Sequence, residues 1–141
     1  MEEDKLPEGI GPHEGRELEL MLAGKKPLAM FNDDLPPDME PSEIALDPYA
    51  KAGRFIKREI VINGFSKYPQ SLRFYFYALP GEAWRMDRLI EIERGFIEDK
   101  VRTTPELETE IGRLLGYDDP DIQVFVHRWF EPKGKGGSSS A

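Results

Sequence analysis

Residues 72–79 read LRFYFYAL, and this stretch decides the fold class. Its apolar positions alternate with mixed ones: Leu72, Phe74, Phe76 and Ala78 against Arg73, Tyr75, Tyr77 and Leu79. A two-residue period is typical of a β-strand, here with one apolar and one amphipathic face. A second apolar stretch, Phe55–Ile62, lies upstream, and the linker between them contains Asn63-Gly64 and Pro69. These are turn residues, so the sequence predicts two antiparallel strands.

Helical patterns lie on both sides of these strands. An amphipathic pattern between Pro12 and Ala23 predicts a helix, and the apolar run Leu28–Phe31 predicts a further strand. Downstream, apolar residues recur at helical spacing in three segments, which we predict to be helices over 82–98, 105–115 and 120–130. The sequence therefore predicts an α+β fold, with a small antiparallel sheet of about three strands and four helices that lie mainly on one face.

The segment 32–48 is expected to be irregular. It contains four prolines and six acidic residues. Because proline disfavours helix and strand interiors, we expect a functional surface loop or an irregular crossover there. The remaining organisation is a flexible segment over 1–10, a single domain over 11–131, and a disordered tail or tag remnant over 132–141, which is rich in Gly and Ser.

The composition limits the class of protein. The chain has 141 residues, no cysteine and a formal net charge of -8. A chain without cysteine has no disulfide and no thiolate metal site. The acidic N-terminus differs from a secretory signal, and no apolar run is long enough to cross a bilayer, so we expect a soluble cytoplasmic protein with no membrane contact.

The charge is distributed unevenly. Residues 27–50 contain six acidic and no basic residues, whereas residues 51–79 contain six basic residues and one acidic one. Attraction between these two segments is the simple structural explanation. The net negative charge disfavours nucleic-acid binding, but the basic segment 51–79 leaves such binding open.

The first functional hypothesis is a small interaction or regulatory protein of the inhibitor or immunity type. The sequence contains no recognisable set of catalytic residues, and its acidic loop would engage a basic protein partner. A Trp-Arg pair follows the last strand, and these residue types are enriched at binding hot spots. The expected partner-binding residues are Asp33, Asp34, Asp38, Glu40, Trp84 and Arg85.

The alternative hypothesis is a small hydrolase or transferase. Its cleft would hold carboxylates beside a lysine, with the proline-rich loop as a lid. The weak catalytic candidates are Glu17, Lys26, Asp33 and Asp34. Asp33 and Asp34 together with Glu59 match no metal-binding motif, and His13 and His127 are interpreted as surface residues, so no metal and no cofactor is predicted.

A third, minor hypothesis is single-stranded nucleic acid binding on the hairpin. Arg73, Tyr75 and Tyr77 share a strand with basic surroundings, and aromatic side chains on a sheet can stack on bases. If helices cover both faces of the sheet, these tyrosines belong to the core instead, and this is the interpretation that we favour.

Overall fold

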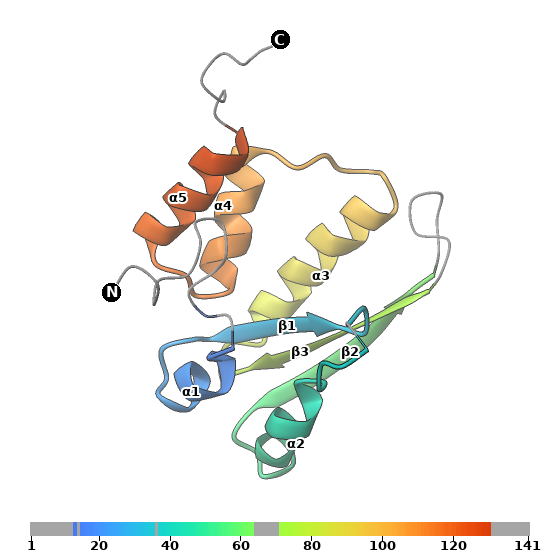
Figure 1. Ribbon diagram of the computed structural model, residues 1–141, viewed down its shortest axis with the longest axis vertical. Helices are drawn as coiled ribbons and strands as arrows, with labels where there is room; N and C mark the ends of the chain where they lie inside the picture. Colours follow the sequence, from blue (N-terminus) through green and yellow to red (C-terminus); the bar gives the residue numbers. More distant parts are fainter. Residues whose placement is uncertain (1–12, 14, 36, 64–70, 131–141) are drawn as a thin grey trace.

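The computed structural model describes residues 13, 15–35, 37–63 and 71–130 of the protein (Figure 1). The α+β prediction is confirmed, because the described residues form one antiparallel sheet and five helices. The elements are α1 (Glu17–Leu22), β1 (Leu28–Asn32), α2 (Glu43–Lys51), β2 (Ile56–Ile62), β3 (Leu72–Ala78), α3 (Trp84–Ile97), α4 (Pro105–Leu114) and α5 (Asp119–Phe130). The predictions for 1–10 and 132–141 and for the turn at Gly64 and Pro69 lie outside the described residues.

β3, which contains the alternating stretch LRFYFYA, lies at the centre of the sheet. The strand order is β1-β3-β2, and both neighbours run antiparallel to β3. Phe76 of β3 lies opposite Met30 on one side and Arg58 on the other. β1 and β2 are therefore both edge strands.

Helices cover both faces of this sheet. Phe74 and Phe76 point to one face and Tyr75 and Tyr77 to the other, and none of the four is more than 3% exposed. In Figure 1, α3, α4 and α5 lie above the sheet, and α1 and α2 lie below it. Three of the five described helices lie on one face, and the two on the other face are needed because Tyr75 and Tyr77 make that face apolar as well.

The segment expected to be irregular contains a helix. Within residues 32–48, α2 begins at Glu43 and continues past Pro48 to Lys51. Glu43 and Asp47 are four residues apart, so both face the same side of α2, and Leu46 is buried against the sheet. The helix near the N-terminus is also shorter than predicted, since α1 begins at Glu17.

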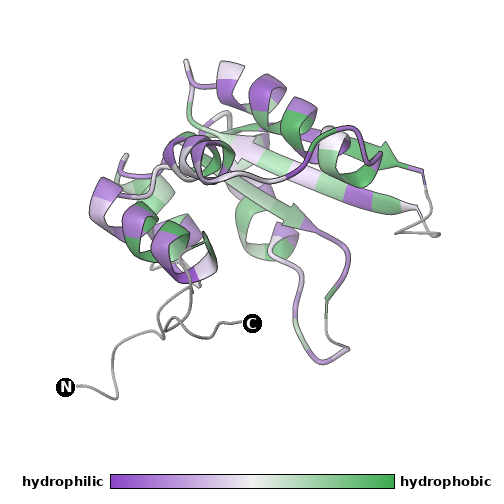
Figure 2. Ribbon diagram, turned by 90° about the horizontal axis from the view of Figure 1, so that it is seen from above, coloured by the Kyte–Doolittle hydropathy of each residue, from purple (hydrophilic) through white to green (hydrophobic). Residues whose placement is uncertain are grey.

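The hydropathy of the helices agrees with this two-sided packing. Figure 2 shows hydrophobic and hydrophilic residues alternating along the helices.

Thr104 caps the start of α4, as the sequence predicts, because its side-chain oxygen accepts a hydrogen bond from the backbone N–H of Leu107 at 3.1 Å.

The chain reverses tightly at the end of α3. The backbone N–H groups of Lys100 and Val101 both donate to the carbonyl oxygen of Gly95, at 2.9 and 3.2 Å. Asp99 adopts a left-handed conformation with φ 61°. A Cβ atom on Gly95 would lie 2.8 Å from Cγ2 of Val101, which is closer than side chains pack. Glycine at 95 therefore allows Val101 to fold back onto α3.

We predict that Gly95→Ala lowers the free energy of unfolding by about 1–3 kcal/mol, because the added methyl group displaces Val101. In the double variant with Val101→Ala, the loss should be smaller than the sum of the single losses, as measured by urea denaturation.

The matched control combines Gly95→Ala with Val124→Ala, since Val124 is an exposed valine of α5. Those two effects should add. If the losses in free energy of unfolding of Gly95→Ala and Val101→Ala simply add in the double variant, the packing of Val101 on Gly95 would be contradicted.

Candidate functional site

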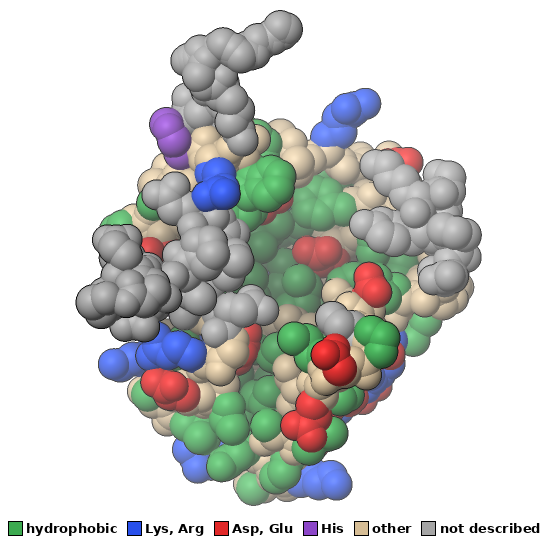
Figure 3. All heavy atoms as spheres, in the orientation of Figure 1, with side chains coloured by type: hydrophobic (Ala, Val, Ile, Leu, Met, Phe, Trp, Pro, Cys, Tyr) green, Lys and Arg blue, Asp and Glu red, His purple; other side chains and the backbone are tan. Residues whose placement is uncertain are grey.

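A groove of about 1260 Å³ opens beside the end of β1. We call it the β1 groove. Its walls come from β1, β3, the last two turns of α3 and the reversed segment 99–103. Figure 3 shows a hollow on this face, with hydrophobic side chains on its walls and acidic side chains within it. The apolar wall residues are Met30, Leu72, Phe74, Phe96, Ile97 and Val101.

The β1 groove contains a carboxyl group in an unusual setting. Glu93 of α3 is half-buried, and no described residue gives it a hydrogen bond or an ion pair. Burial and, to a smaller extent, the nearby carboxylate of Glu108 together raise the pKa of Glu93 to about 7. Near neutral pH this group is therefore poised between its neutral and charged forms.

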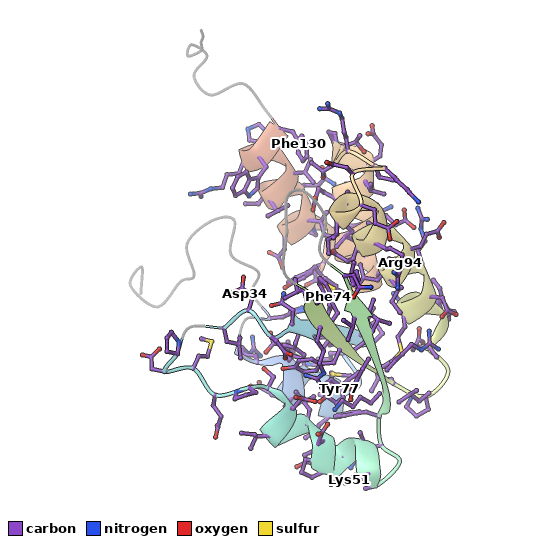
Figure 4. The ribbon with its side chains drawn as sticks, turned by 90° about the vertical axis from the view of Figure 1, so that its right-hand side faces the viewer. Asp34, Lys51, Phe74, Tyr77, Arg94 and Phe130 are labelled. Atoms are coloured by element: carbon purple, nitrogen blue, oxygen red, sulfur yellow. The ribbon has the colours of Figure 1, made fainter. Side chains whose placement is uncertain are left out.

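Glu93 was not among the residues singled out from the sequence. It lies four residues after Leu89 and three before Phe96, so it interrupts the apolar stripe of α3. A glutamate on the buried stripe of an amphipathic helix is the signal that would have identified it. Asp34 was singled out, and the structure places it at the same groove (Figure 4).

The remaining charges of the groove lie on its rim. Asp34 is exposed, and its backbone N–H donates to Oδ1 of Asn32 at 2.8 Å. Lys100 is exposed and its ammonium lies 3.2 Å from Glu98. Arg102 is also exposed. Water screens these rim charges, so the half-buried Glu93 is the strongest electrostatic feature of the groove interior.

A second cluster of charges joins α2 to the lower face of the sheet. The guanidinium of Arg73 in β3 pairs with Glu43, and the ammonium of Lys57 in β2 lies 2.6 Å from the same carboxylate. Lys57 also lies 2.9 Å from Asp47, which accepts a hydrogen bond from the Tyr77 hydroxyl at 2.8 Å. The structure thus pairs the acidic segment with the basic strands within one molecule.

Two more carboxylates complete this cluster. Oε1 of Glu59 lies 3.1 Å from Nε of Arg73, and Oδ1 of Asp33 lies 2.9 Å from Nη1. Arg73 therefore faces three acidic side chains, and its own side chain is 25% exposed. The hydrogen bond from Arg73 is the main cause that lowers the pKa of Glu43, against the effect of burial. Burial acts to lower the pKa of Lys57, but the hydrogen bonds to its carboxylates outweigh it and raise that pKa.

The predicted partner-binding acids are thus divided between two roles. Asp33 is committed to Arg73, while Asp34 adjoins the groove. Asp38 and Glu40 are exposed in the connection before α2.

Trp84 and Arg85 lie at the opposite end of α3 from the groove. Trp84 is 56% exposed, and Arg85 stacks over its ring with the guanidinium carbon 4.7 Å from the ring centre. Arg85 also donates hydrogen bonds to the carbonyl oxygens of Arg113 and Leu114, at 2.9 and 3.2 Å. This arginine therefore stabilises the C-terminal end of α4 and ties it to the start of α3.

The structure does not assemble the predicted cleft of Glu17, Lys26, Asp33 and Asp34. Lys26 precedes β1 and Asp33 follows it, which separates them by about 20 Å at the rise of an extended strand. Lys26 is 2% exposed, and Glu17 begins α1.

Lys26 belongs to a corner at the start of β1. Its ammonium donates to the carbonyl oxygen of Leu115 at 2.7 Å and lies 2.9 Å from Nδ1 of His13. The ring of His13 stacks on Tyr117 with centroids 4.1 Å apart. Burial, and then the charge of Lys26, lowers the pKa of His13 to about 4, so the imidazole is neutral and accepts this hydrogen bond. The contacts with Lys26 and Tyr117 leave His13 half-buried, whereas His127 is exposed on α5, as expected.

The residues expected to form a nucleic-acid platform on the hairpin lie in the core or in ion pairs. Tyr75 and Tyr77 are 1% and 0% exposed, so bases cannot reach their rings. Arg73 is surrounded by carboxylates, which repel phosphate.

Within the described part of the chain, no three His, Asp or Glu side chains are grouped so that they could hold a metal ion. None of the helices there is long and apolar enough to span a bilayer. The chain matches no protein-family model, and comparisons with curated proteins and with solved structures also find no match.

We predict that Glu93→Gln stabilises the protein at pH 8 and has no effect at pH 4. The pKa of Glu93 is raised in the folded state, so its ionisation opposes folding increasingly as the pH rises from about 4.5 through about 7. The gain at pH 8 should be on the order of 1–2 kcal/mol, after allowance for solvent at a half-buried site. Glu91→Gln, on the exposed side of the same helix, is the control. Equal effects of Glu93→Gln at both pH values would argue against burial of the carboxylate.

We also predict that Glu43→Gln lowers the free energy of unfolding by about 1–3 kcal/mol at pH 7, because it leaves Arg73 and Lys57 without their shared carboxylate. The pKa of Glu43 is lowered in the folded state, so this difference should begin to shrink as the pH falls below about 4.5 and should vanish only when Glu43 is protonated in the folded state as well. Chemical denaturation at several pH values measures it. Glu40→Gln should change stability little, and an equal loss in both variants would contradict the role of the cluster.

Proposed function

We propose that this protein is a non-enzymatic interaction or regulatory module, and that the β1 groove receives a segment of a partner protein that is both apolar and basic. The basic partner is the one expected from the sequence, but the contact lies at the groove, at Glu93 inside it and Asp34 on its rim, and not along the whole acidic segment.

The carboxylate of Glu93, which lies in the groove and has no ion-pair partner among the described residues, carries this proposal. A half-buried carboxylate without a counter-ion opposes folding at neutral pH, so a cation brought beside it gains more than it would at the exposed rim. The apolar walls offer burial to the flanking side chains of the same segment. Asp34 at the groove, and Asp38 and Glu40 in the connection that follows, add exposed negative charge that would attract a basic partner.

The groove is also better suited to binding than the acidic cluster below the sheet. There, Glu43, Asp47 and Glu59 already face Arg73 and Lys57. A basic partner would have to displace these intramolecular cations. Asp33 is excluded for the same reason.

A selection experiment tests the proposed function. A phage library of random 12-residue peptides is selected on the immobilised full chain, and enriched peptides are synthesised with a fluorophore and titrated by anisotropy. We expect apolar peptides with Lys or Arg whose dissociation constant rises with salt. Asp34→Lys should weaken binding about five- to tenfold, or about 1–1.4 kcal/mol.

The matched control is Asp121→Lys on α5, which makes the same change of charge at an exposed position away from the groove. Enrichment of acidic peptides, or equal effects of the two charge reversals, would refute the proposed function.

A second candidate function is a small hydrolase or transferase in the same groove. The raised pKa of Glu93 favours it, because a carboxyl group with a pKa near 7 can act as a general acid or base at neutral pH. A panel of chromogenic ester, phosphate-ester and glycoside substrates tests it. This candidate requires turnover that Glu93→Gln abolishes and Glu91→Gln leaves intact.

A further inference from the structure

The hydrogen bonds between β1 and β3 reveal which backbone groups of β1 point to its free edge. The N–H of Leu79 donates to the carbonyl of Pro27 at 3.0 Å, and the N–H of Asp33 donates to the carbonyl of Arg73 at 3.1 Å. In an antiparallel pair, such bonded positions recur every second residue. Odd-numbered residues of β1 therefore bond to β3, and Met30 and Asn32 direct their N–H and C=O groups away from it. No described residue bonds to those outward groups.

The part of the free β1 edge formed by Met30 and Asn32 adjoins the groove. Both residues line the β1 groove, and both are half-buried. The start of β1 is not accessible to another chain, because Leu28 is fully buried and Pro27 packs on the corner at Gly116. The open part of the edge and the apolar walls thus form one continuous surface.

The two edges of the sheet differ in chemistry. β2 reads IKREIVI, and three successive charged residues lie within it. Charges on an edge strand prevent pairing with other chains. β1 reads LAMFN, with no charge and no proline, so its edge lacks this protection. β1 therefore presents an uncharged strand edge beside a groove.

We propose that the partner segment binds as an added β-strand along β1, with hydrogen bonds to Met30 and Asn32. This inference rests on the proposed function and names its binding mode. Extended chains recognise sheet edges through their backbones, while pockets beside the edge select alternate side chains.

The side-chain pattern of the occupant follows from the groove. Successive residues of an extended peptide point to opposite sides, so every second side chain would enter the groove. Met30 and Phe96 offer contacts to apolar side chains, and Glu93 offers a salt bridge to one Lys or Arg. The occupant is therefore an extended peptide with apolar residues two apart and a basic residue at one of these positions.

The test uses the fluorescent peptides selected on the full chain. Each peptide is resynthesised with single backbone N-methyl groups along its length, and each version is titrated by anisotropy. N-methylation removes one N–H donor and adds bulk there without changing the side chain. We expect at least tenfold weakening at alternate positions and little effect at the intervening ones.

A variant of the protein tests the same contact from the other side. Met30→Pro removes an outward N–H and leaves the ladder to β3 intact, since proline is tolerated on edge strands. Val61→Pro is the matched control, because alternation also directs the N–H of Val61 to the free edge of β2. We expect Met30→Pro to weaken peptide binding at least tenfold, and Val61→Pro to change it less than twofold. If either variant is unfolded by circular dichroism, the N-methyl scan decides.

Three outcomes would overturn strand addition. One is sensitivity to N-methylation with no two-residue period, and another is equal binding by the Met30 and Val61 variants. The third is a homodimer that Met30→Pro dissociates in the absence of peptide, since a second copy of the chain would then be the occupant.

The Asp34→Lys variant separates failure of the added strand from failure of the proposed function. If Asp34→Lys weakens binding but N-methylation shows no alternation, the groove remains the binding site and the added strand is rejected. Binding indifferent to Asp34→Lys would reject the proposed function itself.

Discussion

The rest of the structure depends on one constraint, which is that β3 is paired along both edges and buried on both faces. A three-stranded sheet with an apolar centre needs cover on each side, so α3 packs on the face of Phe74 and Phe76, and α1 and α2 pack on the face of Tyr75 and Tyr77. The charges of the same strands cannot enter either core. Arg73 and Lys57 instead meet the acids of α2 where the lower face reaches solvent.

The sequence predicted the elements that rest on local patterns. The strand over 72–79, its antiparallel neighbours and the helices beginning near Thr104 and Asp119 follow from alternation, helical spacing and capping, and the structure confirms them. It did not predict α2, because Pro48 argued against a helix, whereas burial of Leu46 and the pairing of Glu43 depend on the sheet. Tertiary contacts of this kind are not visible in a local pattern.

The candidate site was predicted only at its rim. Asp34 was identified from its place after a predicted strand. Glu93 was overlooked although it interrupts the apolar stripe of α3, and the groove around it depends on residues of β1, β3 and the turn that Gly95 permits. The same turn brings Val101 back to form a wall. The site is therefore assembled from elements that are far apart in sequence, and the uncharged edge of β1 borders it. The partner that we propose for this surface, an extended apolar and basic segment, rests on the carboxylate of Glu93 and on the free backbone groups of β1 together.

Amide hydrogen exchange measured by NMR, with and without a saturating selected peptide, tests this account most directly. In the free protein, the amides of Ala29 and Phe31 should exchange slowly because they bond to β3, while those of Met30 and Asn32 should exchange faster. The account predicts that bound peptide slows exchange at Met30 and Asn32 and leaves Ala29 and Phe31 unchanged. Unchanged exchange at Met30 and Asn32 in the saturated complex would contradict it.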